Sequence, residues 1–389
     1  MRLLFVCPDM HRGGAERQWA TLIPALARRG AEVRLVCLYD EGPLFDEVRR
    51  AGVAAECLGL RGPNDVRGLR RAMAEARGRP GAVVSRTVSP QLVGQAIARR
   101  AGAAHVFNEH TPLTADGGLL AMRPRQRMLS RLVAPHVHRV IEVSERQRLP
   151  LERLGYRTER IVTVPNGVFA SELNPRADRP VMRASLGLDE GDFAVLCVAN
   201  LRVEKGVDTF VEAVARARRA HGGSAGAGRD GGERSESDRE GGEVGLRGLV
   251  AGDGPERGRL ERRIAGVDGV ELLGSRGDVP ELMVACDAVA LLSHAEALPM
   301  SLLEAMALAR PVVTSDVGGA GEAVVDGETG IVVPPGDTDA AGAALAKLAG
   351  DPAAAQAMGE RGRKRQRERF DGEAMVDGYW RALAEVATR

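Results

Sequence analysis

Two carboxylates, eight positions apart, mark the segment best equipped to bind a ligand. Glu296 and Glu304 lie in LLSHAEALPMSLLEAMALARPVV, with Pro299 between them. Proline favours the first helical turn, so a helix beginning near Pro299 would carry Glu304 about one turn further on. A loop carboxylate and a helix carboxylate can then accept hydroxyl groups of one ligand, while first-turn amides bind phosphate oxygens. We expect those amides to belong to Leu298, Met300 and Ser301.

A pair of cations follows another apolar run. In VLCVANLRVEKGVDTFVEAV the run ends near Asn200, and Arg202 and Lys205 precede a helix-like stretch. Ligands of doubly wound folds bind at the carboxyl ends of strands. The planar fork of an arginine and the point charge of a lysine would suit a diphosphate there.

Two segments nearer the N-terminus carry further candidates. Gly13 and Gly14 precede a helix-like start, so a ligand can approach the backbone closely and the helix amides attract anions. The spacing is not GxGxxG, which excludes the dinucleotide fingerprint. His110 follows an apolar run in HVFNEHTP, with Glu109 before it, and could reach a cleft between domains.

Each of these signals, taken singly, has a simpler explanation. Glu296 fits a surface loop acid, and Glu304 fits an acid favoured by the helix dipole. Arg202 and Lys205 fit a solvated surface pair, and His110 a satisfied structural histidine. The glycine pair fits an ordinary turn. The functional interpretation therefore depends on several segments agreeing.

The sequence gives little support for metal or disulfide chemistry. The Asp-x-Asp motif at 337–339 follows Pro-Pro-Gly, and we interpret Asp337 or Thr338 as the N-cap of a helix. The cysteines are too scattered for a zinc site and fit a reducing compartment, with all but Cys57 beside apolar runs as small buried residues. They are Cys7, Cys37, Cys57, Cys197 and Cys286.

Short apolar runs alternate with amphipathic stretches in both halves of the chain. Near-continuous apolar strands separated by helices indicate parallel sheets covered on both faces. The runs of the first half are 3–7, 32–38, 53–58, 82–85, 104–108, 139–143 and 161–164. Those of the second half are 193–198, 246–251, 270–273, 288–292, 311–314 and 330–333. We therefore predict an α/β fold with two Rossmann-like domains.

Breaks in this alternation give the expected domain bounds. Residues 165–180 are rich in turn formers and are interpreted as a linker. We expect an N-terminal domain over 1–168 and a second domain over 169–372. A C-terminal helix over 373–389 would cross back to the first domain. Residues 222–243 hold 8 glycines and 9 charged residues, and we interpret them as a flexible insert.

Composition excludes several classes of protein. The 54 basic and 53 acidic residues leave a net charge of +1, which argues against a general nucleic-acid binder. Aromatic residues make up only 3%, so a base-stacking platform is not expected. The first apolar run is short for a signal peptide, and no apolar stretch is long enough for a transmembrane helix. We expect a cytoplasmic protein.

Eight motifs together resemble the retaining nucleotide-sugar glycosyltransferases of the GT-B fold, family 4 (glycosyl transferases group 1). They occur in family order over nearly the whole chain, and the two acids separated by seven residues are the family signature. Two departures are Ala297, where the family usually has glycine, and Gly321, where it often has proline. The motifs are GGAER (13–17), EHT (109–111), VPNGV (164–168), NLRVEKGVDTFVEA (200–213), AGDGPER (251–257), LLGSRGDVPELMVACD (272–287), EALPMSLLEAMA (296–307) and DGETGIVVPPGD (326–337).

The resemblance implies a role for each candidate. Arg202 and Lys205 resemble the pair that binds the donor diphosphate, and Glu304 the acid that holds the ribose hydroxyls. Glu296 resembles the acid on the transferred sugar, and His110 the first-domain histidine near the reacting carbon. Gly14, beside Gly13, resembles the glycine that lets the donor phosphate approach the first domain. Ser275 and Arg276 lie in the loop that resembles the base-contacting loop.

The implied activity is metal-independent transfer of a hexose-type sugar, with retention, from a nucleoside-diphosphate sugar such as a UDP- or GDP-sugar. No cofactor is implied beyond this donor substrate, and domain closure would exclude water. The acceptor would be a glycan, a lipid-linked molecule or a small molecule. Alternatives are a nucleotide-sugar epimerase of the same fold and a catalytically silent nucleotide-sugar-binding protein. Release of free nucleoside diphosphate distinguishes transfer from epimerisation.

A basic segment in the first half raises the question of membrane contact. Residues 123–148 hold seven arginines against Glu142 and Glu145, a local charge of +5. Part of this segment could form an amphipathic helix with Met128, Leu129, Leu132 and Val133 on one face. The segment could then bind anionic lipid at the inner face of the membrane and admit a lipid-linked acceptor. A solvated basic face explains the pattern equally well.

Overall fold

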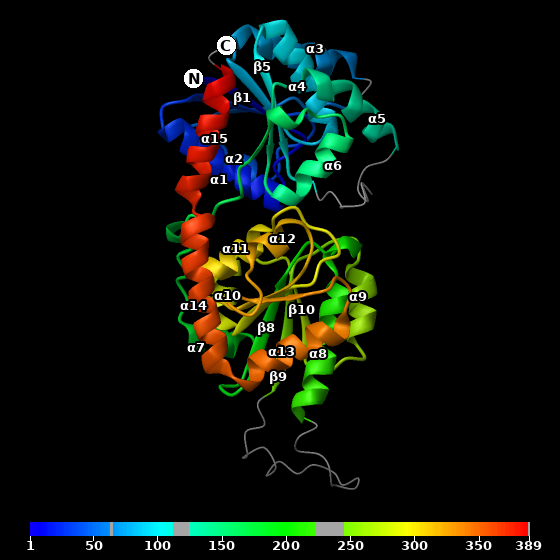
Figure 1. Ribbon diagram of the computed structural model, residues 1–389, viewed down its shortest axis with the longest axis vertical. Helices are drawn as coiled ribbons and strands as arrows, with labels where there is room; N and C mark the ends of the chain where they lie inside the picture. The colour runs from blue at the N-terminus through cyan, green and yellow to red at the C-terminus, as the bar shows by residue number, and fades with distance from the viewer. Residues whose placement is uncertain (63–64, 112–123, 223–244, 388–389) are drawn as a thin grey trace. The chain divides into compact units, whose positions relative to one another are not determined.

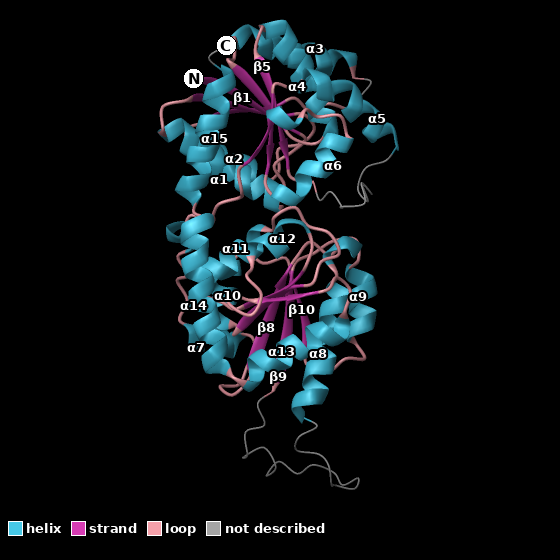
Figure 2. Cartoon of the chain, in the orientation of Figure 1, coloured by secondary structure: helices cyan, strands magenta, loops and turns pink. Residues whose placement is uncertain are grey.

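The computed structural model describes residues 1–62, 65–111, 124–222 and 245–387 of the chain (Figure 1). Contacts divide it into two compact units. The first unit comprises Met1–Gly167, Glu296–Met300 and Gly372–Arg389, and the second comprises Val168–Ala295 and Ser301–Asp371. The sequence-based bounds place 296–300 in the second domain, whereas its contacts group it with the first unit. Each unit is a parallel sheet with helices on its faces (Figure 2).

The first unit contains a seven-stranded parallel sheet in the order β3-β2-β1-β4-β5-β6-β7. Leu4 and Val6 of β1 share a core with Ile97 of α4, whereas Phe5 meets Trp19 of α1 edge to face. Alternate residues of one apolar strand therefore serve both faces of the sheet. The strands are β1 (Arg2–Cys7), β2 (Glu32–Cys37), β3 (Ala54–Cys57), β4 (Ala82–Ser85), β5 (Ala104–Glu109), β6 (Arg139–Glu142) and β7 (Ile161–Thr163). The helices are α1 (Gly14–Arg28), α2 (Pro43–Arg50), α3 (Val66–Ala74), α4 (Val88–Ala101), α5 (Pro124–Val133), α6 (Arg148–Arg153) and α15 (Gly372–Ala387).

The second unit contains a six-stranded parallel sheet in the order β10-β9-β8-β11-β12-β13. Val195 of β8, Phe210 of α8 and Leu345 of α13 belong to one buried core. The strands are β8 (Phe193–Val198), β9 (Leu246–Ala251), β10 (Val270–Gly274), β11 (Ala288–Leu291), β12 (Val312–Ser315) and β13 (Ile331–Val333). The helices are α7 (Arg179–Ser185), α8 (Val207–Gly222), α9 (Arg257–Ile264), α10 (Val279–Ala285), α11 (Met300–Ala307), α12 (Gly318–Ala323), α13 (Thr338–Gly350) and α14 (Pro352–Arg369).

Each apolar run expected from the sequence overlaps a strand, which confirms the α/β class. The predicted linker over 165–180 is wrong in part, because Val168 pairs with Asp371 and α7 already begins at Arg179. The chain does pass from the first unit to the second within this segment, between Gly167 and Val168, but the residues after that point build short ordered elements. The predicted insert lies outside the described residues except for Gly222, the last residue of α8.

The C-terminal part of the chain forms α14 in the second unit and α15 in the first, with the break near Gly372. Tyr379 and Leu383 of α15 are fully buried. α15 contacts α1 and strands β4, β5 and β6. The apolar stripe seen in the sequence is therefore a packing surface of the first unit.

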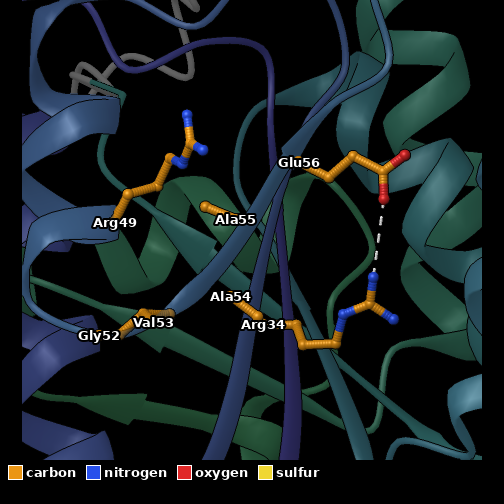
Figure 3. A pocket seen from close by; sticks show the side chains of 7 residues that line it. All are labelled: Arg34, Arg49, Gly52, Val53, Ala54, Ala55 and Glu56. Atoms are coloured by element: carbon orange, nitrogen blue, oxygen red, sulfur yellow. Dashed lines mark ion pairs between the residues drawn. The ribbon is translucent and has the colours of Figure 1, made fainter.

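A shallow hollow of about 450 Å³ lies at the edge strand of the first sheet (Figure 3). It is lined by Arg34, Arg49 and Glu56, together with small residues at 52–55. Arg34 lies 3.7 Å from Glu56 and 3.1 Å from Glu75. The hollow contains none of the site residues predicted from the sequence.

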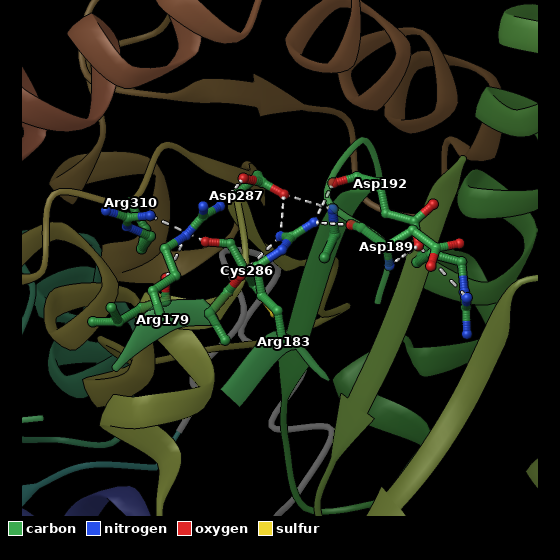
Figure 4. A network of polar contacts seen from close by, with 11 residues as sticks. Arg179, Arg183, Asp189, Asp192, Cys286, Asp287 and Arg310 are labelled. Atoms are coloured by element: carbon green, nitrogen blue, oxygen red, sulfur yellow. Dashed lines mark hydrogen bonds and ion pairs between the residues drawn. The ribbon is translucent and has the colours of Figure 1, made fainter. Parts of the chain in front are cut away.

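A polar network anchors α7 to the second unit (Figure 4). The Asp287 carboxylate accepts hydrogen bonds from Arg179, from Arg183 at 3.2 Å and from the Ala194 amide at 2.8 Å. Arg183 is only 6% exposed and also donates to the backbone carbonyls of 189, 192 and 285. This network ties α7 to the start of β8 and the loop before β11.

Candidate functional site

In the second sheet, the predicted residues follow β8 and β11. These neighbouring strands form the switch point, because the chain builds one wing of the sheet outward from β8 and the other outward from β11. From β8 the chain proceeds through β9 to β10, and β11 begins the other wing of the sheet. Asn200, Arg202 and Lys205 follow β8, and Glu296, whose contacts group it with the first unit, follows β11. Ligands of open α/β sheets bind at such switch points, beyond the carboxyl ends of the strands.

Direct contacts join the two switch-point loops. The His294 amide donates to the Glu204 carbonyl at 2.8 Å, and the Ser293 hydroxyl lies 3.5 Å from the Lys205 carbonyl. Gly206, with φ +59°, lies where a Cβ atom would run into the Leu292 carbonyl. The glycine of the EKG sequence therefore permits this close approach.

The helix that carries the second acid begins where the sequence predicts. α11 begins at Met300, directly after Pro299, and Glu304 is half-buried four residues further on. The Ser301 hydroxyl lies 3.5 Å from the Val198 carbonyl at the end of β8. The first turn of α11 therefore adjoins the strand that leads to the cations.

The loop before α11 is largely buried. Glu296 is 6% exposed, and Leu298 and Met300 are 5% and 8% exposed. The Leu298 carbonyl accepts a hydrogen bond of 2.7 Å from the Asn166 side chain. Burial and this bond fix the backbone that connects the two acids.

Two cations of the second unit have carboxylate partners nearby in the sequence. Arg202 pairs with Glu204 at 3.0 Å. Arg276 follows β10 beside the exposed Ser275 and binds both oxygens of Asp278, at 2.8 and 2.6 Å. β10 lies two strands from β8, so this loop is further from the switch point than the others.

The first unit has its own switch point, between β1 and β4. Gly13 and Gly14 follow β1 and begin α1, with Gly13 as the N-cap in extended backbone. A Cβ atom on Gly14 would lie 3.7 Å from Met300 Cγ, an ordinary contact distance. His110 follows β5, the strand beyond β4.

The imidazole of His110 is held in one tautomer by a buried hydrogen-bond network. Asn108 Oδ1 lies 2.9 Å from His110 Nε2 and 2.7 Å from Trp19 Nε1, while Asn108 Nδ2 donates to the Ile141 carbonyl. This network assigns the Asn108 oxygen as acceptor, so His110 donates from Nε2 and keeps a lone pair on Nδ1. Burial, aided by the positive charge of Arg86, lowers the pKa of His110 to about 3. The ring is therefore neutral near pH 7.

Sequence reasoning missed a pair of buried carboxyl groups beside this histidine. Glu109 and Glu142 pair in register at the ends of β5 and β6, so both side chains point to the same face. Burial raises the pKa of each to about 7. Thr111 donates its amide to Glu109, and Arg148 and Thr163 donate to Glu142. Their position at strand ends was the available signal, since a glutamate closes each apolar run.

The basic segment differs from its predicted form. Arg123 lies outside the described residues, Arg139 pairs with Glu385, and Arg148 pairs with Glu142. The apolar face proposed for the helix is also divided. Leu129 and Val133 pack into the core of the first unit, whereas Met128 and Leu132 are 56% and 63% exposed.

The Asp-x-Asp motif and the cysteines have structural positions. Asp337 caps α13 by accepting hydrogen bonds from the amides of 339 and 340, as predicted. Cys57 is partly exposed and the other four cysteines are buried. Cys7 and Cys37 pair in register with their sulfurs 3.5 Å apart, a juxtaposition that their sequence separation concealed. Within the described ranges, no three His, Cys, Asp or Glu side chains are grouped as metal ligands would be.

Two family models match the chain and together cover most of it. The Glycosyltransferase Family 4 model matches residues 12–172, and the Glycosyl transferases group 1 model matches residues 178–365. The chain therefore belongs to the group 1 glycosyltransferases of the GT-B fold.

Curated relatives match over part of their length. The chain is 32% identical to alpha-D-kanosaminyltransferase of Streptomyces kanamyceticus, over 56% of this chain and 51% of the relative. It is 31% identical to a glycogen synthase of Mycobacterium tuberculosis, over 58% and 48%. It is 30% identical to D-inositol 3-phosphate glycosyltransferase of Nocardia farcinica, over 66% and 56%. The chain thus spans about half the length of these three relatives.

Solved structures match over nearly the whole chain. Anabaena Alr3699/HepE in complex with UDP and glucose has a TM-score of 0.82 at 20% identity, covering 99% of this chain and 100% of that one. Sucrose-phosphate synthase from Thermosynechococcus elongatus has a TM-score of 0.79 at 19% identity, covering 100% and 99%. These likenesses confirm the GT-B fold.

Proposed function

We propose that this protein is a retaining glycosyltransferase that moves a hexose-type sugar from a nucleoside-diphosphate sugar to an acceptor without a required metal. The observation that carries the proposal is the switch point of the second unit. There two cations after β8 and a carboxylate after β11 lie on loops that contact each other. Family membership supports the same activity.

The charges at this switch point suit the donor. Arg202, Lys205 and the first-turn amides of α11 would stabilise the negative charge that grows on the diphosphate as the sugar departs. Glu304 would accept the ribose hydroxyls, and Glu296 those of the transferred sugar. Ser275 and Arg276 would contact the base, which we propose to be the uracil or guanine of a UDP- or GDP-sugar.

The first unit would contribute to the same reaction. Neutral His110 would approach the sugar near the reacting carbon, where the lone pair on Nδ1 can accept a hydrogen bond from a sugar hydroxyl and the ring stays uncharged. Gly13 and Gly14 would let the donor phosphate approach the start of α1. The acceptor, a glycan or a lipid-linked or small molecule, would bind to this unit.

A screen of nucleotide sugars tests the donor assignment. A ligand that binds only the folded protein raises its melting temperature, and the rise grows with the logarithm of the ligand concentration relative to Kd. We expect UDP- or GDP-sugars to raise it, with little difference between samples with and without magnesium. Stabilisation that requires magnesium would overturn the metal-independent assignment.

Product analysis then separates the candidate activities. Transfer or donor hydrolysis releases free UDP or GDP, whereas an epimerase converts the donor without releasing it. A silent binding protein would be stabilised but would do neither. Glu304→Ala should abolish release, and Glu328→Ala, a substitution of an exposed acid in the same unit, should not.

We also propose that α5 contacts an anionic membrane surface through Met128 and Leu132, flanked by the exposed Arg125 and Arg131. Paired apolar and basic side chains favour the headgroup boundary of such membranes. Along the described ranges, no helix is both long and apolar enough to span a bilayer. Flotation with phosphatidylglycerol vesicles at low salt should carry the protein upward, and Met128→Ser with Leu132→Ser should abolish this. A lack of flotation by the unaltered protein would refute the contact.

A further inference from the structure

Arg86 lies at the switch point of the first sheet, between β1 and β4. This position corresponds to the switch point proposed as the donor site in the second sheet. In the second unit the residues after both switch strands, β8 and β11, are candidates for the donor site. In the first unit the residues after β1 were recognised from the sequence, but those after β4 were not. Arg86 is the residue that directly follows β4.

The Arg86 guanidinium is buried, donates a hydrogen bond near one end of the loop that carries the glycine pair, and forms an ion pair at the other end. The side chain is 1% exposed. Its Nη2 donates to the Asp9 carbonyl at 2.7 Å, and its Nη1 lies 2.9 Å from Glu16 Oε1. Asp9 begins the loop after β1, and Glu16 lies in the first turn of α1. One side chain therefore fixes the entry and the exit of this loop.

Gly13 leaves room for the Glu16 side-chain position that makes the second of these contacts. A Cβ atom at this position would collide with Glu16 Oε2, because the Glu16 side chain folds back over the N-cap. Without that Cβ, the carboxylate can turn toward Arg86. The glycine pair thus also serves the Glu16–Arg86 ion pair, in addition to any approach by a ligand.

A chain of contacts continues from Arg86 to His110. The guanidinium carbon lies 5.0 Å from the centre of the Trp19 ring, in cation–π geometry. The Trp19 indole donates to Asn108 Oδ1, which also accepts from His110 Nε2. Arg86 thereby connects the glycine loop, assigned to donor binding, with the imidazole of His110, assigned to catalysis.

The backbone next to Arg86 is strained. Thr87 has φ +60° and ψ 167°, a region that β-branched residues rarely adopt. Such outliers persist only where surrounding contacts hold them, and they concentrate at functional sites. A solvated arginine at the end of β4 would need neither this strain nor burial of its charge.

We propose that Arg86 is a positioning residue that sets the glycine loop for the donor phosphate and His110 for the transferred sugar. This inference rests on the proposed glycosyltransferase function. The charge of a buried arginine is costly unless it is paired and hydrogen-bonded, so the contacts to Asp9, Glu16 and Trp19 form as one unit. Removing the Arg86 guanidinium should therefore reduce the order of both the glycine loop and the His110 imidazole.

The matched test compares Arg86→Met with Arg29→Met. Arg29 stacks on the chain's other tryptophan, Trp380, at 5.3 Å, and its ion pair with Asp377 is largely exposed. Arg86→Met should raise the donor KM and lower kcat, reducing kcat/KM about 100-fold. Arg86→Lys should recover part of the loss, because one ammonium keeps the charge but cannot reproduce the fork. Arg29→Met should stay within about twofold of the unaltered protein.

Hydrogen exchange provides a readout that does not need activity. Amides of residues 9–17 should exchange faster in Arg86→Met than in Arg29→Met. Equal exchange and equal donor KM in the two variants would overturn the inference. If Arg86→Met does not fold, Glu16→Gln tests the same ion pair and should shift exchange and KM in the same direction. If the unaltered protein turns over no nucleotide sugar, the proposed function fails, while the exchange comparison still decides the role of Arg86 in the loop.

Discussion

The two units hold their candidate residues in contrasting ways. In the first unit, His110 hydrogen-bonds to Asn108, and Asn108 and Trp19 are both 0% exposed. In the second unit, the Arg202 side chain is 60% exposed and pairs with Glu204, two residues away. One set of side chains is fixed by the core, and the other is held by short-range ion pairs in loops.

This contrast assigns different physical tasks to the two units. A buried network is ordered before any ligand arrives, so its groups need little reorganisation. An exposed ion pair contributes little to stability and exchanges partners readily. Arg202 can therefore leave Glu204 for a phosphate at little cost, whereas His110 must already be in place. The second unit would bind the donor, and the first would supply fixed geometry.

The largest expected effect concerns Lys205 and Glu304. If the second unit binds the donor, Lys205→Ala or Glu304→Ala should lower kcat/KM at least about 10³-fold, which is about 4 kcal/mol of transition-state stabilisation. The initial rate of nucleoside diphosphate release measures this. Lys205 follows β8 and Glu304 lies in α11, and neither side chain is fully buried, so far-UV circular dichroism and the melting temperature should change little.

Glu328→Ala supplies the control for this prediction, because Glu328 is an exposed acid on a turn of the same unit. Near-normal turnover by either site variant would remove the donor site from the second unit. If nucleoside diphosphate release were lost only in a site variant that also unfolds, the result would not support the contrast between the units.

The next effect concerns the polar network around Asp287 that holds α7 in the second unit. Asp287→Ala leaves Arg183, which is 6% exposed, without its carboxylate partner. Breaking such a buried pair should lower the free energy of unfolding by about 4 kcal/mol, as measured by urea denaturation. Asp337→Ala, which removes only the N-cap of α13, should cost about 1 kcal/mol. Equal losses in the two variants would show that the network in Figure 4 is not a special anchor.

The fold could be predicted from the sequence because its strands are buried on both faces. A run such as Phe193–Val198 is continuously apolar, which few other elements require. The linker could not be predicted as well, since turn formers at 165–180 also begin helices. The predicted apolar face of α5 is split, with Leu129 packed against the core and Leu132 exposed. The sequence did not indicate this, because the two leucines look alike until the neighbouring core is known.

The candidate site shows the same limit. Glu296, Glu304 and Lys205 were found because their types and spacing are local signals. Arg86 has no local signal, since its burial depends on contacts with Asp9, Glu16 and Trp19, up to 77 positions away. Sequence reasoning therefore found candidate residues that carry a local motif more easily than a buried residue whose contacts are distant in the sequence.

A third prediction tests the stability penalty of the buried carboxyl groups in the first unit. Burial raises the pKa of Glu109 from its ordinary 4.5 to about 7. Below pH 4.5 the carboxyl is neutral in both states, and between pH 4.5 and 7 only the unfolded chain loses the proton. The free energy of unfolding should therefore fall by about 3 kcal/mol across this window and stay level above it.

Glu109→Gln should remove that fall and make the protein more stable at pH 8, as measured by urea denaturation at several pH values. Glu142, whose pKa is also raised to about 7, should cause the slope that remains. Glu159→Gln, at an exposed position, is the control and should keep the full slope. An unchanged slope in Glu109→Gln would show that Glu109 is ionised in the folded protein.

The smallest effect is expected where a half-buried cation is already well paired. Arg276 binds both oxygens of Asp278, and this pair raises the pKa of Arg276 and lowers that of Asp278. Arg276→Ala should raise the donor KM only a few-fold, under about 1 kcal/mol, because a base contact would compete with this ion pair. Asp278→Asn frees the guanidinium and should lower the KM slightly. If both variants raise the KM equally, the Arg276–Asp278 pair acts as one rigid unit, and the second unit is more preorganised than its exposure indicates.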